Sequence, residues 1–227
     1  MHLCRLGYEY LSLKDVDWDL DTNIFPEIFK KSIININPDF DVEQAERLLV
    51  DTSLLLDNED LGKAFYEKLI SNSGTKLIDF DNFENNTFNI VTELTYKNGD
   101  EEFRPDIILL INGMPLAFIE VKKPNNRDGI IAERNRINRR FQNKKFRKFV
   151  NITQLMVFSN NMGYDNDDIE PLQGAFYASP SYKKPIFNYF REEETLDLSK
   201  LLAEENDDLE NFVLSLTVTR VKSMIIS

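Results

Sequence analysis

Apolar residues in the first third of the chain recur every three to four positions, which is the spacing of one helical face. In residues 21–33 these positions are Phe25, Ile28, Phe29 and Ile33. The same period continues over residues 41–56 and 58–70, so the pattern predicts three helices. We therefore expect residues 1–75 to form a helical layer that packs on the core.

From residue 76 the apolar segments become short and rich in β-branched and aromatic residues, which is typical of strands. The predicted strands are 76–80, 87–96, 103–111, 115–122 and 152–159, with hairpin turns at Asn98-Gly99 and Asn112-Gly113. A segment from about residue 130 to 149 suits a helix between the last two strands. Strand, helix and strand in this order predict an α/β fold with a central mixed β-sheet flanked by helices, with its core in residues 76–190.

Residues 191–227 have a different composition. Nine acidic residues and one lysine lie between Glu192 and Glu210, among leucines spaced as in a surface helix, and an apolar run follows them. We predict an acidic helix and tail that begin a longer chain. An ordinary edge strand is the other interpretation of the final run.

The segment RPDIILLINGMPLAFIEVKKPNN, residues 104–126, places charged residues at the ends of two apolar strands. If Asn112-Gly113 formed a two-residue turn, Asp106 would point away from Glu120, because side chains alternate between the faces of a sheet. A three-residue loop with Gly113 in the left-handed conformation would place the two carboxylates on one face as neighbours. We predict the three-residue loop. Glu120 and Lys122 share a face in either case.

Two carboxylates held together at strand ends repel each other unless a cation lies between them. Oxygen ligands of this kind suit Mg²⁺ or Mn²⁺, completed by water, a phosphate oxygen and the main-chain carbonyl of Val121. Lys122 has the reach to orient an attacking water and to offset charge on phosphorus. The chemistry predicted is metal-assisted phosphodiester hydrolysis. The alternative is that Glu120 and Lys122 form an exposed ion pair worth under about 1 kcal/mol.

Pro105-Asp106 followed by Glu120-Val121-Lys122 resembles the PD-(D/E)xK nuclease motif. The segment LIDFDNFENNTFNIVTELTY, residues 77–96, together with RPDIILLINGMPLAFIEVKKPNN, is similar to the N-terminal nuclease domain of the restriction (R) subunit of type I restriction-modification enzymes. INPDF near residues 36–40 and ITQLMVFSNN at 152–161 fit the same family. The resemblance implies a restriction-endonuclease-like core, with Asp106 and Glu120 as metal ligands and Lys122 as the catalytic lysine.

In that family the nuclease domain precedes an ATP-driven DNA translocase and acts in a complex with methyltransferase and specificity subunits. This chain contains no G-x-x-x-x-G-K-[ST] phosphate loop, so ATP is expected to serve the family's motor domains and not this chain. Many family members carry Gln-x-x-x-Tyr on the helix after the lysine. Here either Ile137 and Phe141 or Gln142 and Phe146 take those positions, and we favour the first pair.

The net charge of -12 by itself argues against a nucleic-acid partner. Between Arg134 and Lys148, however, the chain has eight basic residues and no acid, and such residues hold DNA by its phosphates without reading its sequence. The other interpretation is a solvated helix face that pairs with the acidic tail or with a neighbouring subunit. We expect contacts with double-stranded DNA from Lys123, Arg127, Arg134, Arg136, Arg139 and Arg140.

His2 and Cys4 are the only histidine and cysteine, which excludes a histidine zinc site, a serine triad and an internal disulfide. With no leader and no apolar stretch long enough for a membrane, we expect a cytoplasmic protein. Two functions remain. A Mg²⁺-dependent type I deoxyribonuclease requires Asp106, Glu120 and Lys122 to converge, whereas a catalytically silent docking module on the same fold would leave them apart or occupied in protein ion pairs.

Overall fold

The fold is organised around one large mixed sheet. The computed structural model describes residues 2–71, 73–124, 127–163, 173–180 and 188–189. Within them the sheet has seven strands in the order β1-β2-β5-β6-β7-β8-β9. β1 is parallel to β2 and β6 is parallel to β7, whereas the other neighbours are antiparallel. The strands are β1 Glu9–Tyr10, β2 Phe88–Thr92, β5 Ile107–Ile111, β6 Met114–Val121, β7 Leu155–Ser159, β8 Ala175–Ala178 and β9 Asn188–Tyr189.

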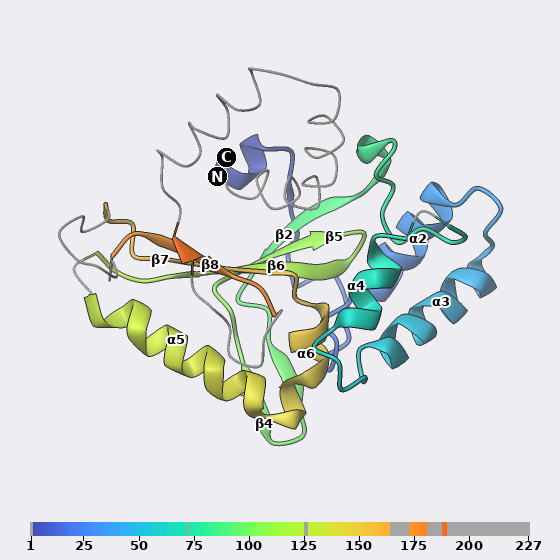
Figure 1. The fold of residues 1–227 in the computed structure, drawn as a ribbon. Coiled ribbons are helices and arrows are strands. Elements are labelled where there is room, and N and C mark those ends of the chain that lie inside the picture. The colour runs from blue at the N-terminus through green and yellow to red at the C-terminus, as the bar shows by residue number, and fades with distance from the viewer. Residues whose placement is uncertain (1, 72, 125–126, 164–172, 181–187, 190–227) are drawn as a thin grey trace, which may run out of the picture.

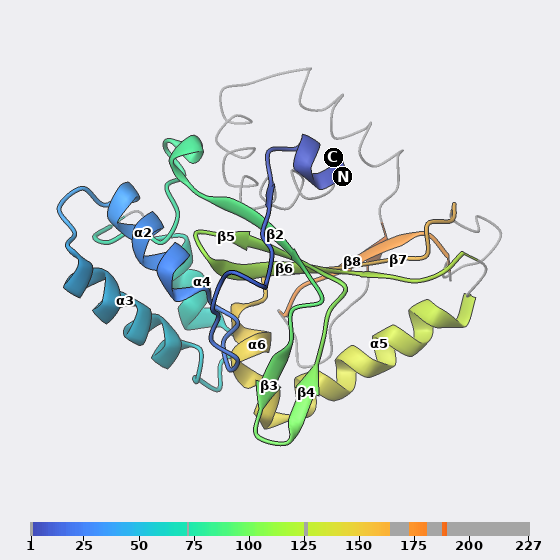
Figure 2. The same ribbon diagram turned by 180° about the vertical axis from the view of Figure 1, so that it is seen from behind.

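Helices cover the sheet unequally. α5 and α6 run along one face, with α2, α3 and α4 beside them (Figure 1). A separate hairpin, β3 Tyr96–Asn98 and β4 Glu101–Phe103, extends below the sheet on the same side, as the view from behind shows (Figure 2). The helices are α1 His2–Arg5, α2 Pro26–Ile36, α3 Val42–Leu55, α4 Lys63–Leu69, α5 Arg127–Gln142 and α6 Arg147–Ile152, with short 3₁₀ turns at Phe83–Asn85 and Lys144–Phe146. The predicted α/β class is confirmed.

The three N-terminal helices lie where the apolar period predicts them. α3 begins with a capping box, in which Asp41 and Gln44 each accept a hydrogen bond from the other's backbone N–H. The single helix predicted over 130–149 is divided in two. Asn143 accepts a hydrogen bond from the Lys145 N–H, and this cap opens the short 3₁₀ turn that separates α5 from α6.

The predicted strand at 76–80 is wrong. The carboxylate of Asp79 accepts hydrogen bonds from the backbone N–H groups of Asp81 and Asn82, so this segment turns instead of pairing with the sheet. Leu77 and Ile78 are nevertheless buried in the core. The apolar residues were therefore recognised correctly, but their backbone conformation was not. The predicted acidic helix and tail at 191–227 lie outside the described residues.

The predicted three-residue loop between β5 and β6 is also wrong. Ile111 pairs with Met114, so Asn112 and Gly113 form a two-residue turn, and both have positive φ angles of 52° and 75°. A β-bulge then shifts the register, because Leu109 pairs with Ala117 while the next residue, Leu110, pairs with Pro115. The extra residue lies within the strand and not in the loop. The bulge shifts the pairing by one residue, which is the shift that the three-residue loop was expected to produce.

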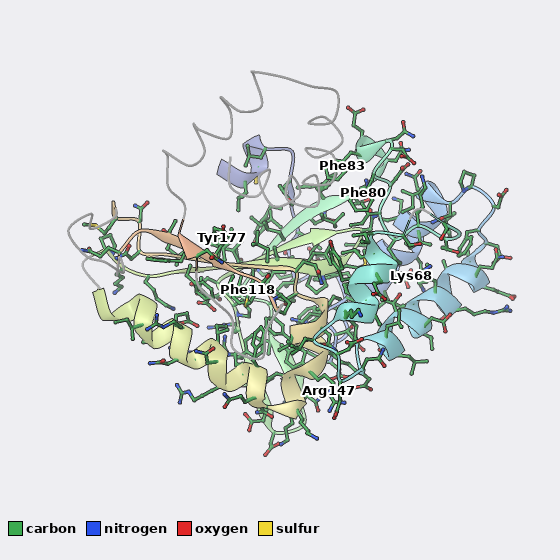
Figure 3. The ribbon with its side chains drawn as sticks, viewed as in Figure 1. Lys68, Phe80, Phe83, Phe118, Arg147 and Tyr177 are labelled. Carbon is green, nitrogen blue, oxygen red and sulfur yellow. The ribbon has the colours of Figure 1, made fainter. Side chains whose placement is uncertain are left out.

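Two apolar layers pack on the helix-covered face. The first is an aromatic layer over β6 and β7 that includes Phe118, Phe149 and Phe158. The second joins α2, α3 and α4 to the turn end of β5 and β6. The opposite face buries smaller residues such as Leu109 and Ala117. Phe118 and Tyr177 mark the two faces in Figure 3.

Candidate active site at the open ends of β5 and β6

The two predicted metal-binding carboxylates lie on neighbouring strands. Ile107 pairs with Ile119, so the register, continued by one residue, sets Asp106 opposite Glu120 on the same face. Asp106 Oδ2 accepts a hydrogen bond of 2.8 Å from the Val121 N–H, which fixes the carboxylate toward β6. The Asp106 carbonyl in turn accepts a hydrogen bond from the Glu93 N–H. The bulge therefore brings together the residues that the sequence singled out.

Lys122 completes this group from the end of β6. Its backbone N–H donates to the Ser159 carbonyl at 2.7 Å, which extends the parallel pairing of β6 with β7 by one step. Its ammonium donates a hydrogen bond of 3.3 Å to Glu120 Oε2. Burial opposes the charged form of Lys122, but the neighbouring carboxylates of Glu133 and Glu120 outweigh it and raise the pKa of the ammonium.

Glu120 has an unfavourable environment for its charged form. The residue is 3% exposed. Burial, followed by the nearby carboxylates of Glu133 and Asp106, raises the pKa of Glu120 to about 7 against the opposing effects of Lys122 and Arg140. A further cation close to Glu120 would stabilise the charged form of this carboxylate. This local electrostatic imbalance is typical of functional sites.

Glu133 is a site residue that sequence reasoning missed. It lies on α5, its side chain is fully buried, and its Oε2 atom is 3.1 Å from the Lys122 ammonium. Arg136 approaches the same oxygen at 2.9 Å, and Arg140 lies 3.9 Å from Oε1. The available signal was the position of an acid four residues before Ile137, which is a buried residue of the same helix.

The predicted DNA-binding residues have different surroundings. Arg140 is 11% exposed, its guanidinium lies 4.1 Å from the centre of the Phe103 ring, and burial lowers its pKa. Lys123 and Arg139 are exposed, and Arg136 is about half exposed while it binds Glu133. Arg134 is partly buried on the same helix. The side chain of Arg127, the first residue of α5, is outside the described part of the structure.

The remaining basic residues of the segment pair with acids of the N-terminal layer and of the β3–β4 hairpin. Arg147 donates to Glu59 at 2.7 Å and to the Asp57 carbonyl at 2.9 Å, and it lies at the foot of α6 (Figure 3). Lys148 pairs with Asp21, and Lys145 with Asp100. These ion pairs join α6 and the turn before it to the N-terminal layer and to the hairpin, which are partners that neither interpretation of the sequence named.

Neither alignment of the Gln-x-x-x-Tyr element supplies both a glutamine and a tyrosine. Ile137 is fully buried in the aromatic layer and Phe141 packs against it, so the favoured pair supplies only apolar contacts. Phe146 is buried in the same layer. Among the described residues of α5, the acid that reaches the Lys122 ammonium is Glu133.

The donor set suits a hard divalent cation. Among the described residues no group of three or more acidic, histidine or cysteine side chains is placed to hold a metal. Mg²⁺, however, is commonly held by one or two carboxylates and keeps several waters. Asp106 and Glu120 on adjacent strands, with the Val121 main chain between them, supply that number. Val121 is 47% exposed, so water and a substrate can reach this edge of the sheet.

Comparison with known proteins places the chain in a family. Residues 1–165 match the model of the type I restriction enzyme R protein N terminus. This match covers more than half of the 227 residues, and the chain therefore belongs to that family.

Curated relatives agree with this assignment. The chain is 33% identical over 150 residues to the MjaIXP endonuclease subunit of a type I restriction enzyme from Methanocaldococcus jannaschii, covering 55% of this chain and 14% of the relative. It is 29% identical over 147 residues to the type I restriction enzyme HindI endonuclease subunit of Haemophilus influenzae, covering 54% of this chain and 14% of that protein. The chain thus matches a small part of the length of these relatives. In the described residues no helix is both long enough and apolar enough to cross a membrane.

Proposed function

We propose that this chain is the nuclease part of a type I restriction enzyme R subunit, and that it hydrolyses DNA phosphodiester bonds with Mg²⁺ or Mn²⁺. The observation that carries the proposal is the bulged β5–β6 pairing, which sets Asp106 opposite Glu120 and beside Lys122. Family membership supports it, because the relatives are described as endonuclease subunits. The motor activity that consumes ATP belongs to other parts of such enzymes.

Each residue has a role that follows from its position. Asp106, Glu120 and the Val121 carbonyl would hold the metal, which when bound would polarise the scissile phosphate and lower the pKa of a coordinated water. The hydrogen bond from the Val121 N–H orients Asp106 so that its second oxygen is available to a ligand. The Lys122 ammonium orients the attacking water and offsets the charge that grows on the phosphate oxygens.

DNA would approach the edge of the sheet at Val121. Lys123 is exposed there, and Arg136 and Arg139 extend the positive charge along α5. Phosphate contacts of this kind position the duplex but carry no sequence information. Recognition of a specific site would come from specificity and methyltransferase subunits, which are the partners proposed for this chain.

A docking module remains the second candidate because of one observation. The Lys122 ammonium is already occupied by two protein carboxylates, Glu120 and Glu133, as that candidate requires. The first candidate requires instead that Glu120 can bind a metal while Lys122 stays in place. Metal binding therefore separates the two.

The test is calorimetric titration of the 227-residue chain with Mn²⁺, beside Asp106→Ala and Glu120→Ala. Each substitution removes a direct ligand and should weaken binding by more than about tenfold, while circular dichroism shows an intact fold. Glu102→Ala is the matched control, since Glu102 is an exposed acid on β4. Absence of binding, or binding that neither substitution affects, would refute the metal site and favour the docking module.

A further inference from the structure

The buried carboxylate of Glu133 is the centre of a charge cluster that joins α5 to the end of β6. Three cationic side chains surround it: Lys122 at 3.1 Å, Arg136 at 2.9 Å and Arg140 at 3.9 Å. A fully buried carboxylate is costly unless it is paired, so a cluster of this kind holds its members in one arrangement. Lys122 is the only member of the four that comes from the sheet.

The part of α5 that follows Glu133 is fixed to the core. Ile137, one turn further on, is fully buried in the aromatic layer. Arg140 stacks on Phe103 of the β3–β4 hairpin. This packing holds Glu133 in place. Its carboxylate is therefore a fixed partner for the Lys122 ammonium.

Lys122 has two carboxylate partners, Glu120 and Glu133, and Glu120 is also needed for the proposed metal. Glu120 Oε2 lies 3.3 Å from the ammonium, yet Glu120 is also a proposed metal ligand. A divalent cation at Glu120 repels the ammonium and competes with it for the same carboxylate. Glu133 faces the ammonium from the helix and is not among the proposed ligands, so its hold on Lys122 does not depend on the metal.

We infer that Glu133 is a positioning residue, which keeps the Lys122 ammonium in the site when Glu120 binds the metal. This inference rests on the proposed function. It assigns Glu133 no direct contact with the substrate, because the side chain is fully buried. Arg136 shares the Glu133 oxygen and is about half exposed, so the same carboxylate also places one guanidinium at the surface beside the site.

The experiment measures the mobility of the Lys122 side chain directly. The full chain is prepared with lysine labelled at Cε, and the Lys122 signal is identified by its loss in Lys122→Met and its retention in Lys123→Met. Order parameters are then recorded with and without saturating Mg²⁺ in the wild type and in Glu133→Gln. Glu102→Gln makes the same chemical change at an exposed position and serves as the control.

In the wild type and in Glu102→Gln, Lys122 should remain ordered in both conditions. In Glu133→Gln without Mg²⁺, the order parameter should fall in part, because Glu120 is then the remaining close carboxylate. Addition of Mg²⁺ should lower it further, below about 0.6, the range of flexible groups. An ordered Lys122 in Glu133→Gln with Mg²⁺ bound would overturn the inference. If Glu133→Gln does not fold, Glu133→Asp keeps the charge and withdraws it by one methylene, and an order parameter equal to that of the wild type would then overturn it.

Failure of the proposed function gives a different result. If Mg²⁺ moves no lysine signal and calorimetry detects no binding, the metal site is absent. The comparison without metal still tests Glu133, because Glu133→Gln leaves Lys122 with Glu120 as its remaining close carboxylate. Loosening of Lys122 relative to Glu102→Gln would support the positioning role, and an unchanged order parameter would overturn it.

Discussion

Replacing Gly113 by alanine tests the close approach of the β5–β6 turn to helix α2. Gly113 has a φ of 75°, and its carbonyl accepts a hydrogen bond of 2.9 Å from the Phe25 N–H at the start of α2. A Cβ atom at this position would lie 2.8 Å from the Phe25 carbonyl oxygen and 2.8 Å from the Phe29 nitrogen. Both are backbone atoms of α2 and its cap, so a side-chain rotation cannot relieve the clash.

The magnitude has two parts. The left-handed conformation costs an alanine about 1 kcal/mol, and forcing a methyl group into a filled contact costs about 2 kcal/mol more. Gly99→Ala is the matched control, because Gly99 has a φ of 64° but nothing within 4 Å of its added Cβ. Gly99→Ala therefore has only the cost of the left-handed conformation. The free energy of unfolding should therefore fall by about 3 kcal/mol in Gly113→Ala and about 1 kcal/mol in Gly99→Ala.

Urea unfolding followed by circular dichroism measures both values. A difference of about 2 kcal/mol between the variants corresponds to a midpoint about 1 M lower for Gly113→Ala, provided the slopes agree. Equal losses in the two variants would refute the packing argument and leave only the backbone term. A fall of less than about 1 kcal/mol in Gly113→Ala would refute both.

The same turn marks the limit of what the sequence could predict about the site. The requirement that Asp106 and Glu120 share a face was correct, and Asn112-Gly113 was recognised as a turn. The location of the extra residue was wrong because tertiary contacts determine it. The Asn112 side chain accepts from the Thr87 N–H and donates to the Leu77 carbonyl and to Asn86, and these partners hold the turn at two residues.

The spacing of apolar residues predicted the helices, the parallel crossover and the central strands. Each of these elements buries one or both of its faces, and burial leaves a regular apolar pattern in the sequence. Glu133 did not follow from it. Its importance depends on the angle at which α5 crosses the end of β6, and the spacing of residues along one helix does not specify that angle. A count of charges also could not predict which basic residues of the segment 134–148 form ion pairs within the protein. Lys145, Arg147 and Lys148 each meet an acid that lies more than forty residues away in the chain.

Two further predictions concern charged residues other than Asp106, Glu120 and Lys122. Burial opposes the charge of Asp79, but the Asn85 side chain, the Asn82 N–H and Lys76 outweigh it and lower the pKa of the carboxyl. Because the unfolded chain binds this proton more tightly, the stabilisation is present above about pH 4 and is lost as the pH falls through the lowered pKa. Urea unfolding at several pH values should show a smaller acid-induced loss in Asp79→Asn than in the exposed control Asp39→Asn, and parallel profiles would contradict this. For DNA, Lys123→Ala should weaken duplex binding and reduce the salt slope by about one phosphate contact, measured by fluorescence anisotropy in EDTA. Lys148→Ala should leave that affinity unchanged and lower stability instead, because its ammonium is paired with Asp21 and Asp57. If both substitutions weakened DNA binding equally, the ion pairs with the N-terminal layer would not keep Lys148 from the duplex, and the DNA surface would extend over α6.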